Sequence, residues 1–376
     1  MIRKERNIAM NRPKICCLFG GRSEEYEVSL VSCSCVLREI DREKWDVVTV
    51  GVTKQGMLYR YDGEISAIET DAWRLDKAHL RPAAFVPGED GGYLLSFDGE
   101  TGAVAAREKI DAAFPVMHGT FCEDGRLQGY LDLCKIPYVG APCAASAVAM
   151  DKVFTKRILQ GSGIRQAAYT VLGRAEIEAD PAAAAEKAAR VAVAAFPLFV
   201  KPANAGSSVG VCKAKDLPSL ARALCEAARY DEKVLTEETI TGREIEVAVL
   251  GGAKPMAATP GEIEPGAEFY DYMDKYKNGK SRAYIPARIK PQTAQKLREQ
   301  AVLIFRLLGC RGLSRVDFFV RERDGEEEIV FNEINTLPGF TPISMYPKMM
   351  QHDGLSYSAL IDRLLCLALE DAKERT

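Results

Sequence analysis

The feature of this sequence that most constrains its fold is a strand, a glycine turn, a helix and a second strand within residues 14–52. Lys14–Phe19 is an apolar run that two glycines end, and Ser23–Ile40 carries acidic residues near its start, where a helix dipole favours them. Asp46–Val52 is the next apolar run. This order predicts a parallel α/β unit, and Ile110–Met117 is a further buried strand.

The length of 376 residues predicts more than one domain. We expect three segments, with boundaries at residues 1–139, 140–232 and 233–376. The first contains the α/β unit, followed over residues 53–108 by irregular chain with hairpins. The second contains an alanine-rich helix and a strand that leads to a glycine/serine loop, and the third contains long strands and a closing amphipathic helix.

Composition excludes several classes of protein. A net charge of -3 gives no reason to expect a nucleic-acid partner. No stretch approaches the ~18–20 apolar residues that span a bilayer, and the polar start of the chain does not resemble a signal peptide. The 11 cysteines are scattered without a CxxC pair, as is usual for free thiols in a reducing compartment. We therefore expect a cytoplasmic protein with no membrane partner.

A glycine/serine loop indicates a phosphate site. Ala205–Gly210 follows a strand that ends in Lys201, and its small residues, among them Ser207 and Ser208, let backbone N–H groups approach phosphate oxygens. No Gly-Lys-Ser/Thr follows, so this is not a P-loop. Lys152 is a second candidate contact. An ordinary surface loop is the alternative interpretation.

Three oxygen-bearing side chains near the C-terminus indicate a metal site. Glu333 and Asn335 are two residues apart on a strand, so they point to the same face, and Asp317 lies on another strand. Hard oxygen ligands without His or Cys suit Mg²⁺. Arg315 shares a strand face with Asp317, where it can stabilise developing oxyanion charge. The alternatives are a solvated acidic pair and a surface ion pair.

Seven sequence strings together resemble the D-alanine–D-alanine ligase family, which has the ATP-grasp fold. They run in family order from residue 19 to about residue 347. They are Phe19–Leu30, His118-Gly119 with Glu123–Gly125, Met150–Lys152, Lys201-Pro202 with Gly206–Gly210, Phe269–Tyr272 with Lys275-Tyr276, Ser314–Asp317 and Asn332–Phe340.

The resemblance implies an α/β (α+β), three-domain ATP-grasp protein. Residues 1–139 would form an N-terminal Rossmann-like domain, 140–232 a central ATP-grasp subdomain, and 233–376 a C-terminal subdomain that carries the metal site and a lid, Glu268–Ile285. The implied ligands are ATP, two Mg²⁺ or Mn²⁺ ions and two D-alanine molecules, and the implied assembly is a homodimer. Phosphoryl transfer to the first D-alanine would give an acyl phosphate, which the amine of the second would attack.

The resemblance also assigns roles. The nucleotide would be held by Lys152, Lys201, Ser208, Glu237, Glu238, Ile240, Glu244 and Lys275, and the metals by Asp317, Glu333 and Asn335. The first D-alanine would be oriented by Glu27 with His118, and the site closed by a network of Glu27, Ser207 and Tyr276. The oxyanion would be held by Arg315 and the N–H of Gly339, and the second carboxylate by Ser344 with Lys275.

The second substrate has alternatives. The Lys275-Tyr276 pair disfavours D-lactate, because ligases that use lactate lack it. Gly51–Gly56 and Tyr59–Ile68 resemble the VanG-type D-alanine–D-serine ligases, whereas Met345 and Gly261–Ile263 follow the alanine pattern. We expect D-alanine, with D-serine as the alternative. A non-catalytic nucleotide-binding protein is a second alternative, but such a protein should have lost a metal ligand or the arginine. A dinucleotide-dependent oxidoreductase would need a GxGxxG turn after the first strand. The residues after that strand do not supply this turn, which argues against that class of enzyme.

Overall fold

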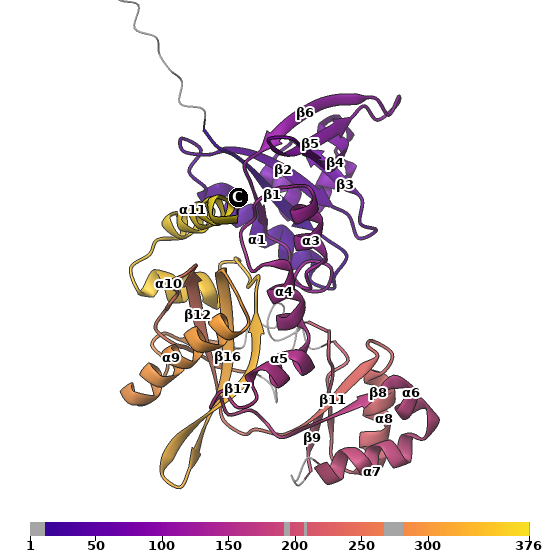
Figure 1. Ribbon diagram of the computed structural model, residues 1–376, viewed down its shortest axis with the longest axis vertical. Coiled ribbons are helices and arrows are strands. Elements are labelled where there is room, and N and C mark those ends of the chain that lie inside the picture. The colour runs from indigo at the N-terminus through magenta and orange to yellow at the C-terminus, as the bar shows by residue number, and fades with distance from the viewer. Residues whose placement is uncertain (1–11, 192–195, 207–208, 267–280, 376) are drawn as a thin grey trace, which may run out of the picture.

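The computed structural model describes residues 12–191, 196–206, 209–266 and 281–375. Within these ranges the strands form a seven-stranded, a four-stranded and a six-stranded sheet. Figure 1 shows the seven-stranded sheet at the top, the six-stranded sheet below it and the four-stranded sheet at the lower right. None of the described helices combines the length and the apolar character needed to cross a bilayer.

The first sheet has the strand order β6-β5-β4-β3-β2-β1-β7. Its parallel part consists of β1 (Lys14–Gly20), β2 (Asp46–Val52) and β7 (Ala112–Pro115), with α1 (Tyr26–Glu39) connecting the first two. Gly20 makes the turn after β1, because its φ is +86° and a Cβ there would lie 2.2 Å from the Val52 carbonyl oxygen. The predicted parallel α/β unit is therefore confirmed.

Antiparallel strands extend this sheet over the part of the chain that was expected to be irregular. They are β3 (Leu58–Tyr61), β4 (Leu80–Gly88), β5 (Gly91–Phe97) and β6 (Val104–Ile110), and between β3 and β4 lie α2 (Ile65–Glu69) and two short 3₁₀ helices, η1 (Ala72–Leu75) and η2 (Lys77–His79). The expected hairpins are thus part of one continuous sheet.

The second sheet has the order β10-β9-β11-β8. Its strands are β8 (Tyr169–Gly173), β9 (Leu198–Pro202), β10 (Cys212–Ala214) and β11 (Lys233–Glu238), and its helices are α6 (Arg174–Ala179), α7 (Pro181–Val191) and α8 (Leu217–Ala227). The helices share one core cluster with the strands and lie together in Figure 1. Because β11 pairs with both β8 and β9, we propose a domain boundary after residue 238 instead of after residue 232.

The third sheet has the order β15-β14-β12-β16-β17, with β13 paired to β12. The strands are β12 (Arg243–Gly251), β13 (Met256–Ala257), β14 (Gly261–Glu264), β15 (Arg282–Tyr284), β16 (Gly312–Arg323) and β17 (Glu326–Asn335). α9 (Pro291–Leu307) and α10 (Met345–His352) both contact β12. The two long strands β16 and β17 carry the side chains expected to bind metal.

The remaining helices connect the sheets. α3 (Arg126–Leu133), α4 (Cys143–Met150) and α5 (Lys152–Leu159) lead from the first sheet toward the other two, as Figure 1 shows. α11 (Tyr357–Arg375) contacts α1, β7, β12 and β16. The Trp45 indole N–H also donates to Asp362 on α11 at 3.0 Å. The two ends of the chain therefore share one hydrophobic core, which fixes the first sheet against the third.

Candidate functional site

A cavity of about 640 Å³ lies where the three sheets approach one another. Its lining comes from β9 and β11 of the second sheet, from β12, β14, β16 and β17 of the third, and from Glu25 and His118 of the first. This volume is in the range of small-molecule sites, and the polar groups converge on it from separate parts of the chain. It is the candidate active site.

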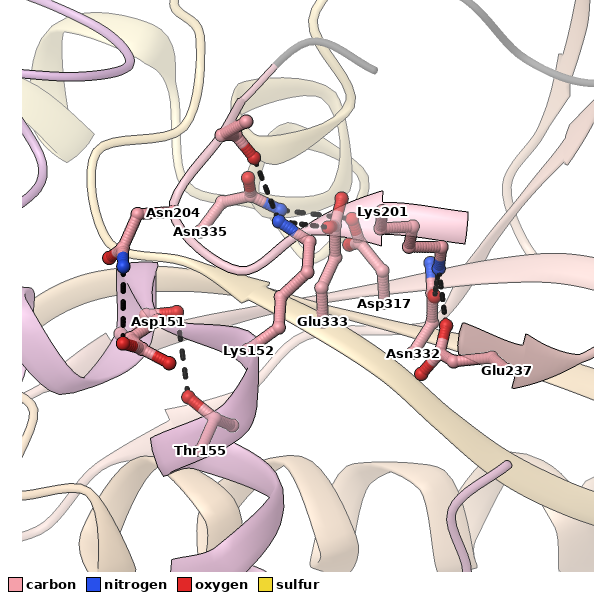
Figure 2. A network of polar contacts seen from close by, with 12 residues as sticks. Asp151, Lys152, Thr155, Lys201, Asn204, Glu237, Asp317, Asn332, Glu333 and Asn335 are labelled. Carbon is pink, nitrogen blue, oxygen red and sulfur yellow. Dashed lines mark hydrogen bonds and ion pairs between the residues drawn. The ribbon is translucent and has the colours of Figure 1, made fainter. Parts of the chain in front are cut away.

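The three predicted metal ligands come together on β16 and β17. Asp317 pairs with Glu333 across the two strands, and the Asn335 amide donates to Asp317 Oδ2 at 3.0 Å. Among the described residues no group of three His, Cys, Asp or Glu side chains is placed to hold a metal ion, and the predicted donor set consists of two carboxylates and one amide. These hard oxygen donors fit Mg²⁺ or Mn²⁺. Figure 2 shows all three side chains on one side of the strands.

Arg315 lies beside this donor set. Its guanidinium donates to both Asp317 oxygens, at 2.8 and 2.7 Å, and its Nε lies 3.2 Å from Glu246 Oε2 on β12. Burial lowers the pKa of Arg315, but the charges of Asp317 and Glu246 outweigh it and raise that pKa well above the usual value. The arginine is therefore a fixed positive charge in the cavity wall. Sequence reasoning missed Glu246, although it stands two residues after the predicted Glu244 and directly before an apolar run in the same strand.

The two predicted phosphate lysines also face the cavity. Lys152 begins α5, and its ammonium donates to the Ala205 carbonyl at 2.8 Å and lies 3.9 Å from Glu333. Lys201 ends β9, 2.7 Å from Glu237 and 3.4 Å from Asn332. Figure 2 shows both ammonium groups directed toward the carboxylates of the third sheet and β11. Two cations beside a glycine loop are suited to an oligophosphate.

The predicted nucleotide segment lines the same cavity through Glu237, Glu238, Ile240 and Glu244. Glu237 is buried, and burial alone would raise its pKa; the neighbouring Lys156 and Lys201 lower it to about 2. The Glu238 carboxylate accepts the Ala168 N–H at 3.0 Å, which fixes the start of the segment. Sequence reasoning missed Lys156, because nothing in the sequence distinguishes it from a surface lysine of a helix.

The structure corrects the placement of Glu27. Its carboxylate points outward to Lys54 at 2.6 Å, its side chain is 58% exposed, and it does not line the cavity. Glu25 lines it instead, with its carboxylate against Gly119 and Gly206. Residues two apart at a helix start point in different directions, so only one of these glutamates can face inward. The Glu-Glu-Tyr-Glu string offers three carboxylates, and the one predicted to orient the substrate, Glu27, is not the one that lines the cavity.

His118 and Glu123 are buried beside Glu25. Because the Leu337 carbonyl can only accept, His118 Nδ1–H donates to it at 2.8 Å, and the Ser32 hydroxyl donates to Nε2 at 3.0 Å. Burial lowers the pKa of His118, so its imidazole is neutral at pH 7. Burial, and then the charge of Glu25, raises the pKa of Glu123 to about 8. Glu123 was part of a matching string, but no role had been predicted for it.

The loop after β17 brings the remaining predicted groups to the cavity. Glu123 accepts the Leu337 N–H at 3.1 Å and Ser32 accepts the Phe340 N–H at 3.2 Å, so both ends of this loop are held. Gly339, Ser344 and Met345 line the cavity. The residues Ser207, Ser208, Lys275 and Tyr276, and most of the expected lid, lie outside the described residues.

Comparison with known proteins shows a match over nearly the whole chain. A family model described as "D-ala D-ala ligase N-terminus" matches residues 14–141, and one described as "D-ala D-ala ligase C-terminus" matches residues 158–366. A D-alanine--D-alanine ligase of Clostridium novyi is 44% identical, covering 96% of this chain and 98% of the relative. One of Ruminiclostridium cellulolyticum is 45% identical, covering 96% of both chains.

Two solved structures resemble this fold. The VanG D-Ala:D-Ser ligase of Enterococcus faecalis matches with a TM-score of 0.83 at 39% identity, covering 95% of this chain and 99% of its own. The D-alanine-D-alanine ligase of Coxiella burnetii matches with a TM-score of 0.81 at 32% identity, covering 97% of this chain and 96% of its own.

Proposed function

The chain belongs to the D-alanine–D-alanine ligase family, with its ATP-grasp fold, and on this premise we propose that it joins two D-alanine molecules at the expense of ATP. The observation that carries the proposal is the convergence of Lys152, Lys201, Arg315 and the Asp317–Glu333 pair on one cavity. The products would be D-alanyl-D-alanine, ADP and phosphate. On the family resemblance alone, we also propose that the protein is a homodimer.

The cavity would hold ATP with its base near Glu238 and Ile240 and its phosphates toward Lys152 and Lys201. Both lysines are preorganised by fixed partners, so little ordering would be needed when phosphate arrives. Asp317, Glu333 and Asn335 would hold the divalent cations. When bound, these cations would offset charge on the transferring phosphoryl group.

In the first step, a carboxylate oxygen of one D-alanine would attack the γ-phosphorus. The bond from that phosphorus to the bridging oxygen breaks, and ADP leaves with the electron pair, which gives an acyl phosphate. Glu25 supplies a carboxylate at the cavity wall that can hold the D-alanine ammonium. His118 is neutral beside it, so it would not repel that ammonium.

In the second step, the uncharged amine of another D-alanine would attack the acyl carbon. The carbonyl oxygen then gains negative charge, which Arg315 and the Gly339 N–H can stabilise from the cavity wall. The carbon–oxygen bond to phosphate breaks, phosphate leaves with the electron pair, and the nitrogen loses its proton. Ser344 would receive the carboxylate of this second D-alanine.

Met345 supports alanine as the second substrate. Its side chain is buried at the cavity edge, close enough to Gly261 that a Cβ there would meet Met345 Cε at 2.3 Å. A thioether offers a serine hydroxyl no good partner, although an apolar pocket rejects an added hydroxyl by only about 100-fold. The likeness to the VanG structure favours D-serine as the second candidate.

Phosphate release from ATP tests the proposal. We expect release with D-alanine alone, a dipeptide of two alanines by mass spectrometry, and weaker incorporation of D-serine from an equimolar mixture. No release with any D-amino acid, despite ATP binding, would instead support a non-catalytic nucleotide-binding protein. An excess of D-alanyl-D-serine over D-alanyl-D-alanine would instead establish a D-alanine–D-serine ligase.

A further inference from the structure

Lys156 is a buried charge that the proposed reaction does not use. It lies on α5, one helical turn after Lys152, and its side chain is only 2% exposed. It is not among the residues that line the cavity. The free energy needed to bury an ammonium group is high unless a partner offsets it, and a lysine in this position therefore requires a physical reason.

The partner of Lys156 is Glu237. Its Oε1 lies 2.6 Å from Lys156 Nζ, while its Oε2 lies 2.7 Å from Lys201 Nζ. The carboxylate thus bridges a lysine behind the cavity wall and a lysine that faces the cavity. Among the residues that the structure describes, no other carboxylate forms an ion pair with Lys156. The Tyr169 ring, 5.2 Å from its ammonium, covers it further.

The charges of this triad explain what Lys156 contributes. Two lysines and one glutamate leave one excess positive charge, and that charge is exposed to the cavity at Lys201. Without Lys156 the remaining pair would be neutral, and Glu237 would be free to close entirely on Lys201. Glu237 Oε2 already lies 2.7 Å from Lys201, but the negative charge of this carboxylate is shared with Lys156; without Lys156 the whole charge would offset that of the phosphate-facing ammonium.

We propose that Lys156 is a positioning residue for nucleotide binding: it occupies half of the Glu237 carboxylate and thereby keeps Lys201 available to the phosphates of the nucleotide. This proposal rests on the proposed function, because it assumes that a nucleotide binds beside Lys201. It predicts an effect on the nucleotide and none on the D-alanine sites. If Lys156 were needed only for folding, replacing it would destabilise the protein and weaken the binding of both substrates.

The test measures Mg-ADP binding by calorimetry in the full-length chain, together with the KM for D-alanine at saturating ATP. For Lys156→Met we expect the Kd for Mg-ADP to rise at least about tenfold, with the KM for D-alanine within about twofold. Lys156→Arg keeps the charge and should stay within about threefold of the parent. Lys187→Met removes an exposed lysine of α7 that forms an ion pair with Glu176 at 2.5 Å, and should change neither value.

The double variant Lys156→Met/Glu237→Gln separates the proposed route from a general charge effect. Compared with Glu237→Gln alone, so that any direct contact of Glu237 with the nucleotide cancels, adding Lys156→Met should change the Kd for Mg-ADP by less than about threefold. If Lys156→Met folds poorly, Lys156→Gln replaces it, because the amide can still donate to Glu237 without the charge.

Unchanged Mg-ADP affinity in folded Lys156→Met would overturn the proposal. So would a Lys156→Met effect as large in the Glu237→Gln background as in the parent. Failure of the proposed function gives a different result, since the parent protein itself would then bind no Mg-ADP or release no phosphate.

Discussion

Asp317 on β16 lies directly opposite Glu333 on β17, immediately before a bulge that shifts the register of the two strands. The bulge leaves Asn332 without a partner in that register, and its side chain reaches Lys201 at 3.4 Å. A single irregularity therefore directs one residue to the phosphate lysine and the next to the metal donors. Bulges commonly aim side chains in this way beside active sites.

Replacing Glu333 tests the metal assignment. Glu333→Gln keeps the size of the side chain but removes one of the two negative charges that would attract the cations. We expect phosphate release to fall by at least about 100-fold, with a melting temperature close to that of the parent. Turnover retained at near the parent rate would refute the assignment of Glu333 to the metal site.

Glu25, which precedes α1, and Glu27 in its first turn form a matched pair. We expect Glu25→Gln to lower kcat/KM for D-alanine by about 100-fold, because a neutral amide holds an ammonium poorly and misplaces the substrate. Glu27→Gln should stay within about twofold, since it removes only an exposed ion pair with Lys54. Steady-state kinetics of the two variants compares them directly. The reverse order of effects would show that the orientation of α1 described above is not the functional one.

Met345 tests selectivity between alanine and serine. Met345→Arg places a hydrogen-bond donor at the cavity edge beside Gly261, so it should shift the product ratio from D-alanyl-D-alanine toward D-alanyl-D-serine by at least about tenfold. Mass spectrometry of products from equimolar D-alanine and D-serine measures this ratio. Met345→Leu, which stays apolar and of similar size, is the control. An unchanged ratio would mean that other residues set the selectivity.

Glu123 gives the stability a pH dependence. Burial, and then the charge of Glu25, raises its pKa to about 8 from the usual 4.5 of a glutamate, so the folded protein binds this proton more tightly than the unfolded chain does. The contribution of this Glu123 proton to the free energy of unfolding is therefore complete below pH 4.5 and is lost as the pH rises toward 8. Thermal unfolding of Glu123→Gln between pH 5 and 8 should show a flatter decline than the parent. Equal slopes for the two proteins would contradict the raised pKa.

The sequence by itself determined the parallel α/β unit and singled out two lysines and three oxygen donors that line one cavity; their roles toward phosphate and metal stay predictions. Each depends on local pattern: an apolar run before two glycines, a lysine at a strand end, or two oxygen donors spaced by two on a strand. The resemblance to the family likewise needed only short strings in order. That these donors share a face could be predicted because alternation along a strand fixes the face on which a side chain lies.

Only the tertiary structure decided which of Glu25 and Glu27 faces the cavity and why Lys156 is buried. The direction of Glu25 depends on how α1 docks on β1 and on the loop at Gly206. This loop is far from Glu25 in the sequence. The surroundings of Lys156 depend on β11, which pairs between β8 and β9 and thereby places Glu237 beside α5. Local sequence carries no information about such contacts, because the partners of a charge are set by packing between distant segments.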